Sequence, residues 1–195
     1  MQHPTKVFDE WATLGKDKGM EISHAASVSE ILEYALSRLK TENNYFTFLD
    51  FGCGNGWVAD QISKKDNCSL SIGVDGAENM ILNAKNRKSE AVFYLDDLNS
   101  FKSDKKFDLI FSMEVLYYLE NPSIVVERIK NMLNPKGRFI MGIDHYFEND
   151  ECHDWQEKVG TRMHMFKEEE WLDFCLLYTS PSPRDRTRSR MPSSA

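Results

Sequence analysis

Three alternating glycines, Gly52, Gly54 and Gly56, follow directly on an apolar segment that is typical of a buried strand. A short apolar helix pattern comes next. A strand that turns tightly into a helix brings its backbone close to a ligand, because glycine has no side chain to keep the ligand away. The dinucleotide fingerprint G-x-G-x-x-G requires a glycine at position 57, where Trp57 stands. The spacing therefore disfavours a dinucleotide, although an NAD(P)-dependent oxidoreductase stays open as the alternative enzyme.

Acidic residues follow the other expected strands. Asp75 comes 19 residues after Gly56, and Asp96-Asp97 follows the next strand. A carboxylate at the end of the second strand can accept hydrogen bonds from both ribose hydroxyls. Asp75 therefore supports an adenosine-containing ligand, without choosing between cofactors.

Apolar patterning predicts the elements that position these residues. Strands are expected at 47–51, 70–74, 91–95, 107–112 and 138–143. Helices are expected from a capping box at 27–30, around 58–62, over 77–87, and from Asn121-Pro122 to about 133, with two more helical segments at 155 and 168–174. Alternating strands and helices predict an α/β fold, a Rossmann-like, doubly wound, mostly parallel sheet with helices on both faces.

The sequence Asp50-Phe51-Gly52-Cys53-Gly54-Asn55-Gly56 resembles the first motif of class I S-adenosylmethionine-dependent methyltransferases. Segment 107–119 is similar to the post-strand segment of small-molecule methyltransferases, except that Tyr118 stands where many relatives have histidine. Residues 45–146 as a whole resemble the methyltransferase domain often labelled type 11. We expect Tyr117 and Tyr118 to be packing residues.

The resemblance implies S-adenosyl-L-methionine as the cofactor. Asp50 would lie near its amino-acid portion, and an acid after the third strand would accept from the adenine amino group, for which we favour Asp96. The full set expected at the cofactor is Asp50, Gly52, Cys53, Gly54, Gly56, Asp75, Asp96 and Met113. A non-catalytic cofactor-binding module stays open beside the enzyme.

The resemblance leaves the methyl acceptor unidentified, and we expect a small molecule. An oxygen nucleophile would need a base to remove its proton, and His145 and His24 are the candidates. Transfer between a bound donor and acceptor depends mainly on holding the two in line.

Three segments are expected: an N-terminal helical cap at 1–44, a methyltransferase core at 45–174, and a tail at 175–195. The tail matches the translation of a sequencing-library adapter at both of its ends, so we interpret it as non-native, with a natural Ser/Pro/Arg-rich tail as the alternative. On this interpretation the core is truncated and its sheet lacks the last two strands. The strand at 138–143 would then present an apolar edge.

The composition of the chain limits the kinds of partner and the kinds of site that we expect. The net charge is −7, and without the tail it would be −10, which argues against nucleic-acid binding. No apolar run is long enough to span a bilayer, and no signal peptide is visible. Cysteines at 53, 68, 152 and 175 lack the spacing of a zinc site or a disulfide framework. We expect a cytoplasmic protein without a metal, and its oligomeric state is left open.

Overall fold

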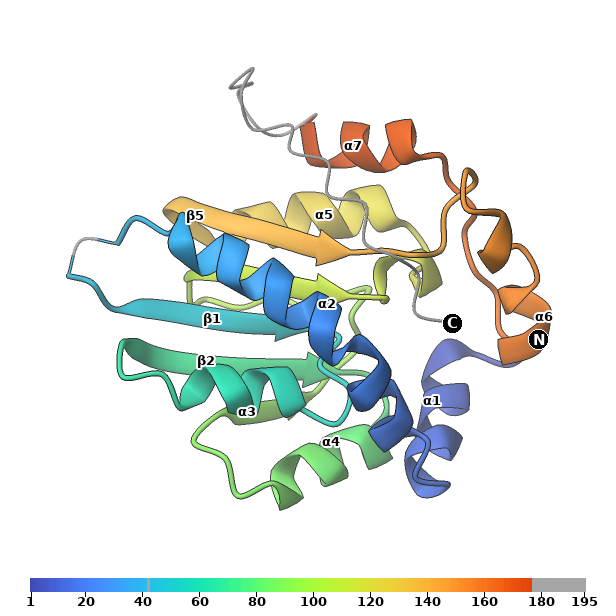
Figure 1. Cartoon of the computed structure of the whole chain (residues 1–195), viewed down its shortest axis with the longest axis horizontal. Helices are drawn as coiled ribbons and strands as arrows, with labels where there is room; N and C mark the ends of the chain where they lie inside the picture. The colour runs from blue at the N-terminus through green and yellow to red at the C-terminus, as the bar shows by residue number, and fades with distance from the viewer. Residues whose placement is uncertain (42, 177–195) are drawn as a thin grey trace.

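The computed structural model describes residues 1–41 and 43–176, so the expected tail lies outside the described residues from position 177 onward. Two helices open the chain, and strands then alternate with helices, except that the strand at 107–113 follows the strand at 92–95 with no helix between them (Figure 1). The helices are α1 (Pro4–Thr13), α2 (Asp17–Ser37), α3 (Trp57–Ser63), α4 (Glu78–Asn86), α5 (Pro122–Asn131), α6 (Trp155–Val159) and α7 (Glu168–Leu176), with short 3-10 turns η1 (Leu116–Tyr118) and η2 (Asp150–Cys152).

A five-stranded, wholly parallel sheet forms the centre, in the order β3-β2-β1-β4-β5. The strands are β1 (Phe46–Phe51), β2 (Cys68–Asp75), β3 (Val92–Leu95), β4 (Phe107–Met113) and β5 (Leu133–Gly142). The strand order reverses between β1 and β4, which pair from Phe48 with Leu109 to Asp50 with Phe111. This confirms the predicted doubly wound α/β fold, and ligands of such sheets bind at this reversal.

Both faces of the sheet are covered, because neighbouring residues of each strand point to opposite sides. Phe48 packs with side chains of α2 and α3, whereas Leu49 packs with side chains of α5. Both side chains are fully buried. In Figure 1, α2 and α3 lie in front of the strands and α5 lies behind them. The two layers hold the strands in register and bring their carboxyl ends together.

The helix expected to begin at Ser27 begins ten residues earlier, at Asp17, so the predicted capping box is wrong. Ser27 lies inside α2. The apolar face that carried the prediction is real, because Val28, Leu32 and Ala35 are buried. The first half of α2 is instead held by polar contacts to distant loops, which a pattern of apolar residues does not reveal.

The helix predicted from Asn121-Pro122 is confirmed as α5. The Asn121 side chain accepts a hydrogen bond from the backbone N–H of Ile124, and Pro122 occupies the first turn. An oxygen-bearing cap satisfies one of the free N–H groups at a helix start. At the edge of the sheet opposite β3, β5 is an edge strand whose apolar side chains are half-buried. The expected truncation stays a prediction.

Candidate cofactor and substrate site

A cavity of about 1050 Å³ opens at the carboxyl ends of the strands. Its floor includes the residues that end β1, β2 and β4, and its walls come from α1, α2 and the segment around Arg162 and His164. A cavity of this size matches the volumes at which proteins bury small ligands and cofactors. Of the residues expected at the cofactor, it is lined by Asp50, Gly52, Cys53, Gly54, Asp75 and Met113.

The three glycines of the loop serve different ends. A Cβ on Gly52 would come within 2.3 Å of Val115 Cγ2, and one on Gly56 within 2.6 Å of Ala84 Cβ. These two glycines let neighbouring elements pack closely. A Cβ on Gly54 would meet only Met80 Sδ, at 3.9 Å, because Gly54 faces the cavity. Gly56 does not line the cavity, so its place fits a packing role and not the expected cofactor contact.

Asp75 joins the end of β2 to the glycine loop. Its Oδ2 accepts a hydrogen bond from the Gly54 N–H at 2.9 Å, and its Oδ1 accepts from the Ala77 N–H at 2.8 Å. Burial is the largest influence on this carboxyl group and raises its pKa, which hydrogen bonds from the backbone of Ala77, Gly54 and Gly76 partly counter. Each carboxylate oxygen keeps a second lone pair for a ligand hydroxyl.

Asp50 is 2% exposed, and its Oδ2 has no hydrogen-bond partner. Burial, and then the neighbouring charge of Asp75, raises the pKa of Asp50 to about 8. A buried polar atom without a partner is costly and needs an explanation, such as a catalytic role or a bound water or ion. Asp50 lines the cavity, so a donor or cation placed there would satisfy it.

At the end of β3 the structure separates the two adjacent acids. Asp97, Leu98 and Asn99 line the main cavity, whereas Asp96 lines only a shallow neighbouring hollow. The Asp96 side chain instead accepts from the Asp97 N–H at 2.8 Å. Asp97 is therefore the better-placed acid at the main cavity, and the assignment of Asp96 to adenine stays a prediction. The sequence pattern could not separate them, because both follow the same strand.

The two histidines proposed as bases lie in different places relative to the cavity. His24 lines the cavity from α2. His145 is 1% exposed and lies outside the cavity lining, between the rings of Tyr117 and Trp155 at centroid distances of 5.0 and 6.1 Å. This placement disagrees with the expected contact between His145 and a methyl acceptor. Tyr117 is buried as expected, and Tyr118 packs edge-on against Phe8 while also lining the cavity.

Glu114 is a cavity residue to which the sequence pattern assigned no role. It follows β4 directly and lines the cavity beside Val115 and Tyr118. Burial, and then the charge of Asp144, raises its pKa to about 8. The only sequence signal was its place at the end of an apolar strand.

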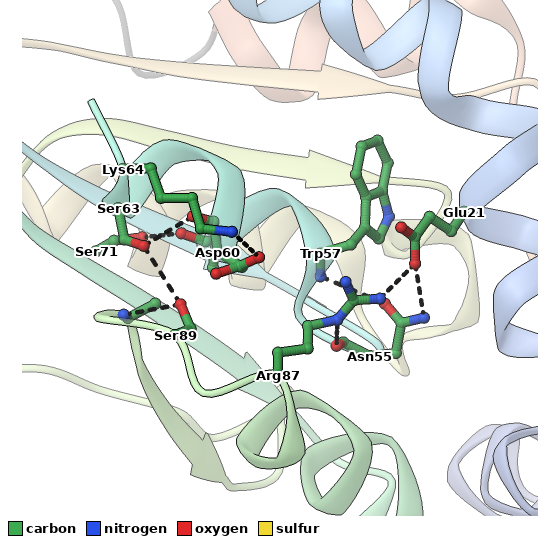
Figure 2. Close-up of polar contacts among 11 residues, drawn as sticks. Glu21, Asn55, Trp57, Asp60, Ser63, Lys64, Ser71, Arg87 and Ser89 are labelled. Atoms are coloured by element: carbon green, nitrogen blue, oxygen red, sulfur yellow. Dashed lines mark hydrogen bonds and ion pairs between the residues drawn. The ribbon is translucent and has the colours of Figure 1, made fainter.

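A polar cluster ties α2 to the glycine loop (Figure 2). Asn55 Nδ2 donates to Asp17 Oδ2 at 3.1 Å and to Glu21 Oε2 at 3.3 Å. Arg87 Nε donates to the Asn55 carbonyl at 2.7 Å, and its guanidinium pairs with Glu21. We call Asp17, Glu21, Asn55 and Arg87 the clasp. It holds the N-terminal helices as a wall of the cavity.

The α1 helix is held on the same side. Asp9 accepts hydrogen bonds from the backbone N–H and the side-chain amide of Asn79, at 2.6 and 2.8 Å. The expected N-terminal cap therefore contributes directly to the cavity.

None of the helices in residues 1–41 and 43–176 combines the length and the apolar character that crossing a membrane requires.

The sequence profile of a family described as "Methyltransferase domain" matches residues 42–173, which is most of the chain. The chain belongs to this family. Malonyl-acyl-carrier-protein O-methyltransferase 2 of Ilyobacter polytropus is 28% identical over 149 residues, which cover 73% of this chain and 52% of that protein. Ubiquinone biosynthesis O-methyltransferase of Coxiella burnetii is 25% identical over 146 residues, 72% of this chain and 59% of that one. The chain spans about half the length of the curated relatives it matches.

Solved structures give the same fold. A methyltransferase solved in complex with the Trm112 methyltransferase activator of Haloferax volcanii superposes with a TM-score of 0.75, is 29% identical, and covers 90% of this chain and 75% of its own. An S-adenosylmethionine-dependent methyltransferase of Thermotoga maritima has a TM-score of 0.63 at 22% identity, over 87% of this chain and 77% of its own. The fold is that of class I methyltransferases, as the glycine motif led us to expect.

Proposed function

We propose that this chain binds S-adenosyl-L-methionine and transfers its methyl group to a small-molecule acceptor. One observation supports this most: the open space in front of Gly54, bordered by the carboxyl groups of Asp50 and Asp75 at the reversal of strand order. This arrangement offers bare backbone, two acceptors and an unpaired buried oxygen within one cavity.

The residues present suit this cofactor chemically. Asp50, with its partnerless Oδ2, suits the cationic methionine end. Asp75 is the acceptor for ribose hydroxyls, and Asp97 with the Leu98 backbone is the candidate for the adenine edge. When bound, the cofactor would supply an activated methyl group on a positively charged sulfur.

The chain's own residues would then bind the cofactor and the acceptor, orient them and exclude water. Holding two reactants in contact removes much of the entropic cost of their meeting. The clasp fixes the glycine loop, and α1 and α2 cover the site from the solvent side. His24 faces the same cavity and stays a proposed base for a protic acceptor.

Titration with S-adenosylhomocysteine and, separately, with NADH tests the proposal. We expect saturable binding of S-adenosylhomocysteine and none of NADH. Gly54→Val should abolish this binding, because its side chain would enter the space reserved for the ligand.

Gly15→Val is the matched control, because Gly15 has a φ of +72° against +51° for Gly54, and it too has open space around its Cβ position. Gly15 lies outside the cavity lining. Equal loss of binding in both variants, or binding of NADH alone, would contradict the proposal. Binding without transfer to any acceptor in a metabolite screen would favour a non-catalytic module.

A further inference from the structure

Glu114 is held in one orientation at the cavity wall. Its φ of 56° lies in the left-handed region that residues with side chains seldom adopt. Its N–H donates to the Gly142 carbonyl at 2.9 Å, its Oε1 accepts from the Asp144 N–H at 2.6 Å, and its Oε2 accepts from the Tyr117 hydroxyl at 2.7 Å. Strained backbone that persists at a cavity often belongs to a functional site.

The position of Glu114 relative to the glycine loop is defined by its neighbour. Val115 fills the space beside Gly52 that a side chain would otherwise occupy. The proposed adenosine contacts, Asp75 and Asp97, lie at the ends of β2 and β3, on the other side of β1 from β4. Glu114 therefore stands on the half of the cavity that the nucleoside does not use, next to the loop that the methionine end would reach.

The cavity surfaces available to an acceptor are largely apolar and aromatic. Phe8 and Tyr118 meet edge to face at 5.0 Å, and both line the cavity together with Met20, Val28 and Trp57. Aromatic faces of this kind attract cations as well as apolar groups. An acceptor here would present an apolar or aromatic body to the wall.

The ionisable side chains that line the cavity are mostly acidic. Among its lining residues within the described part of the chain, seven are aspartates or glutamates, and Arg162 is the single arginine or lysine. Asp144 adds a further negative charge close to Glu114. Above the pKa of Glu114, a carboxylate brought to this side chain would meet like charge and could donate no hydrogen bond.

We propose that Glu114 receives the nucleophilic group of the methyl acceptor and selects an amine on an apolar or aromatic body over a carboxylate. This rests on the proposed function, because it assigns the second substrate of the same cavity. An ammonium or amine N–H donates to the Glu114 carboxylate, and the same contact excludes acceptors that have only lone pairs.

The contact with Glu114 also provides a place for the proton that an ammonium acceptor must lose before transfer. An ammonium acceptor gives one proton to the Glu114 carboxylate and becomes a neutral amine. The nitrogen lone pair then forms the bond to the methyl carbon, the carbon–sulfur bond breaks, and both electrons of that bond stay on sulfur. The nitrogen gains the positive charge that sulfur loses. A pKa of about 8 lets Glu114 accept and release a proton at slightly alkaline pH.

Calorimetric binding of three probes with one aromatic body tests this inference. Phenethylamine, phenethyl alcohol and hydrocinnamate are titrated into the full chain saturated with S-adenosylhomocysteine, at about pH 9, where Glu114 is ionised because its pKa is about 8. We expect phenethylamine to bind at least about tenfold more tightly than hydrocinnamate, because a charged hydrogen bond replaces like-charge repulsion. Phenethyl alcohol should lie between them.

Glu114→Gln tests the residue itself, and Gln keeps the size and the acceptor oxygen that Asp144 N–H needs. We expect about tenfold weaker binding of phenethylamine, hydrocinnamate binding no weaker than before, and unchanged affinity for S-adenosylhomocysteine. Glu120→Gln is the control, because Glu120 lines the same cavity but is exposed.

Equal affinities for the three probes, tightest binding of hydrocinnamate or of phenethyl alcohol, or no effect of Glu114→Gln would each overturn the inference. Failure of all three to bind a chain that does bind S-adenosylhomocysteine would overturn it as well. Failure of S-adenosylhomocysteine itself to bind would instead count against the proposed function.

Discussion

The carboxylate of Asp75 accepts a hydrogen bond from the backbone N–H of Gly54 across 2.9 Å, so the end of β2 holds the bend that follows β1. The same side chain also accepts from the Ala77 N–H, which leads into α4. One carboxylate thus joins two neighbouring strand ends, and Asp75 also lines the cavity.

Asp75→Asn should weaken S-adenosylhomocysteine binding by about 1–3 kcal/mol, because an amide cannot accept from both N–H groups and two ribose hydroxyls. Isothermal titration measures the loss. Asp66→Asn is the control, since Asp66 is exposed and outside the cavity. Unchanged affinity in Asp75→Asn would remove Asp75 from the ligand contacts.

Asp97→Asn should weaken binding of S-adenosylhomocysteine more than Asp96→Asn does, because only Asp97 lines the main cavity. Asp97 also accepts from Ser100 Oγ at 2.9 Å and from the Asn99 N–H at 3.0 Å. Ser100→Ala therefore controls for simple loosening of this turn. A larger effect from Asp96→Asn would restore the original assignment of Asp96.

Asp50 predicts an unusual pH dependence. Its pKa rises on folding from 3.8 to about 8, so between these values the folded state binds more protons at this group than the unfolded state does. The free energy of unfolding of the ligand-free protein should therefore fall as pH rises from about 4 to 8.

Asp50→Asn should flatten this slope, raise stability at the alkaline end and weaken cofactor binding. Urea unfolding at several pH values measures the first two effects, and titration measures the third. Glu114 contributes a slope of the same sign, because its pKa is also raised to about 8, so some dependence should persist. A steeper slope in Asp50→Asn would be incompatible with a raised pKa at this residue.

Arg87→Met should lower the free energy of unfolding by about 1–3 kcal/mol, because it removes the donor to the Asn55 carbonyl and the cation paired with the Glu21 carboxylate. It should also weaken S-adenosylhomocysteine binding, since Asn55 belongs to the glycine loop. Lys158→Met removes an exposed pair with Asp154 and should cost at most about 0.5 kcal/mol. Equal costs would mean that the clasp contributes no more than a surface ion pair.

The predicted fold and the observed one agree where the information is local. The strands and the glycine loop follow from apolar runs and from spacing, and the start of α5 follows from the cap at Asn121. The start of α2 was predicted wrongly because the partners of Asp17 and Glu21 lie far away in the sequence, near positions 55, 83 and 87.

The site divides in the same way. Asp50, Gly54 and Asp75 stand at motif positions, and the structure brings them to one cavity. His145 has a suitable place in the chain, but aromatic rings cover it. The choice between Asp96 and Asp97 depends on how a four-residue strand ends. The position of the Glu114 side chain depends on a left-handed backbone conformation that no pattern of residues predicts.

The beginning of the chain is fastened across the cavity. The Gln2 N–H donates to the Gly160 carbonyl at 3.0 Å, and the Thr161 hydroxyl donates to the Gln2 carbonyl at 2.9 Å. Gln2, His3 and Arg162 all line the cavity. We expect fraying of this short strap to accompany ligand exchange, so a change that loosens the contacts of Gln2 should alter association and release rates even where equilibrium affinity is preserved.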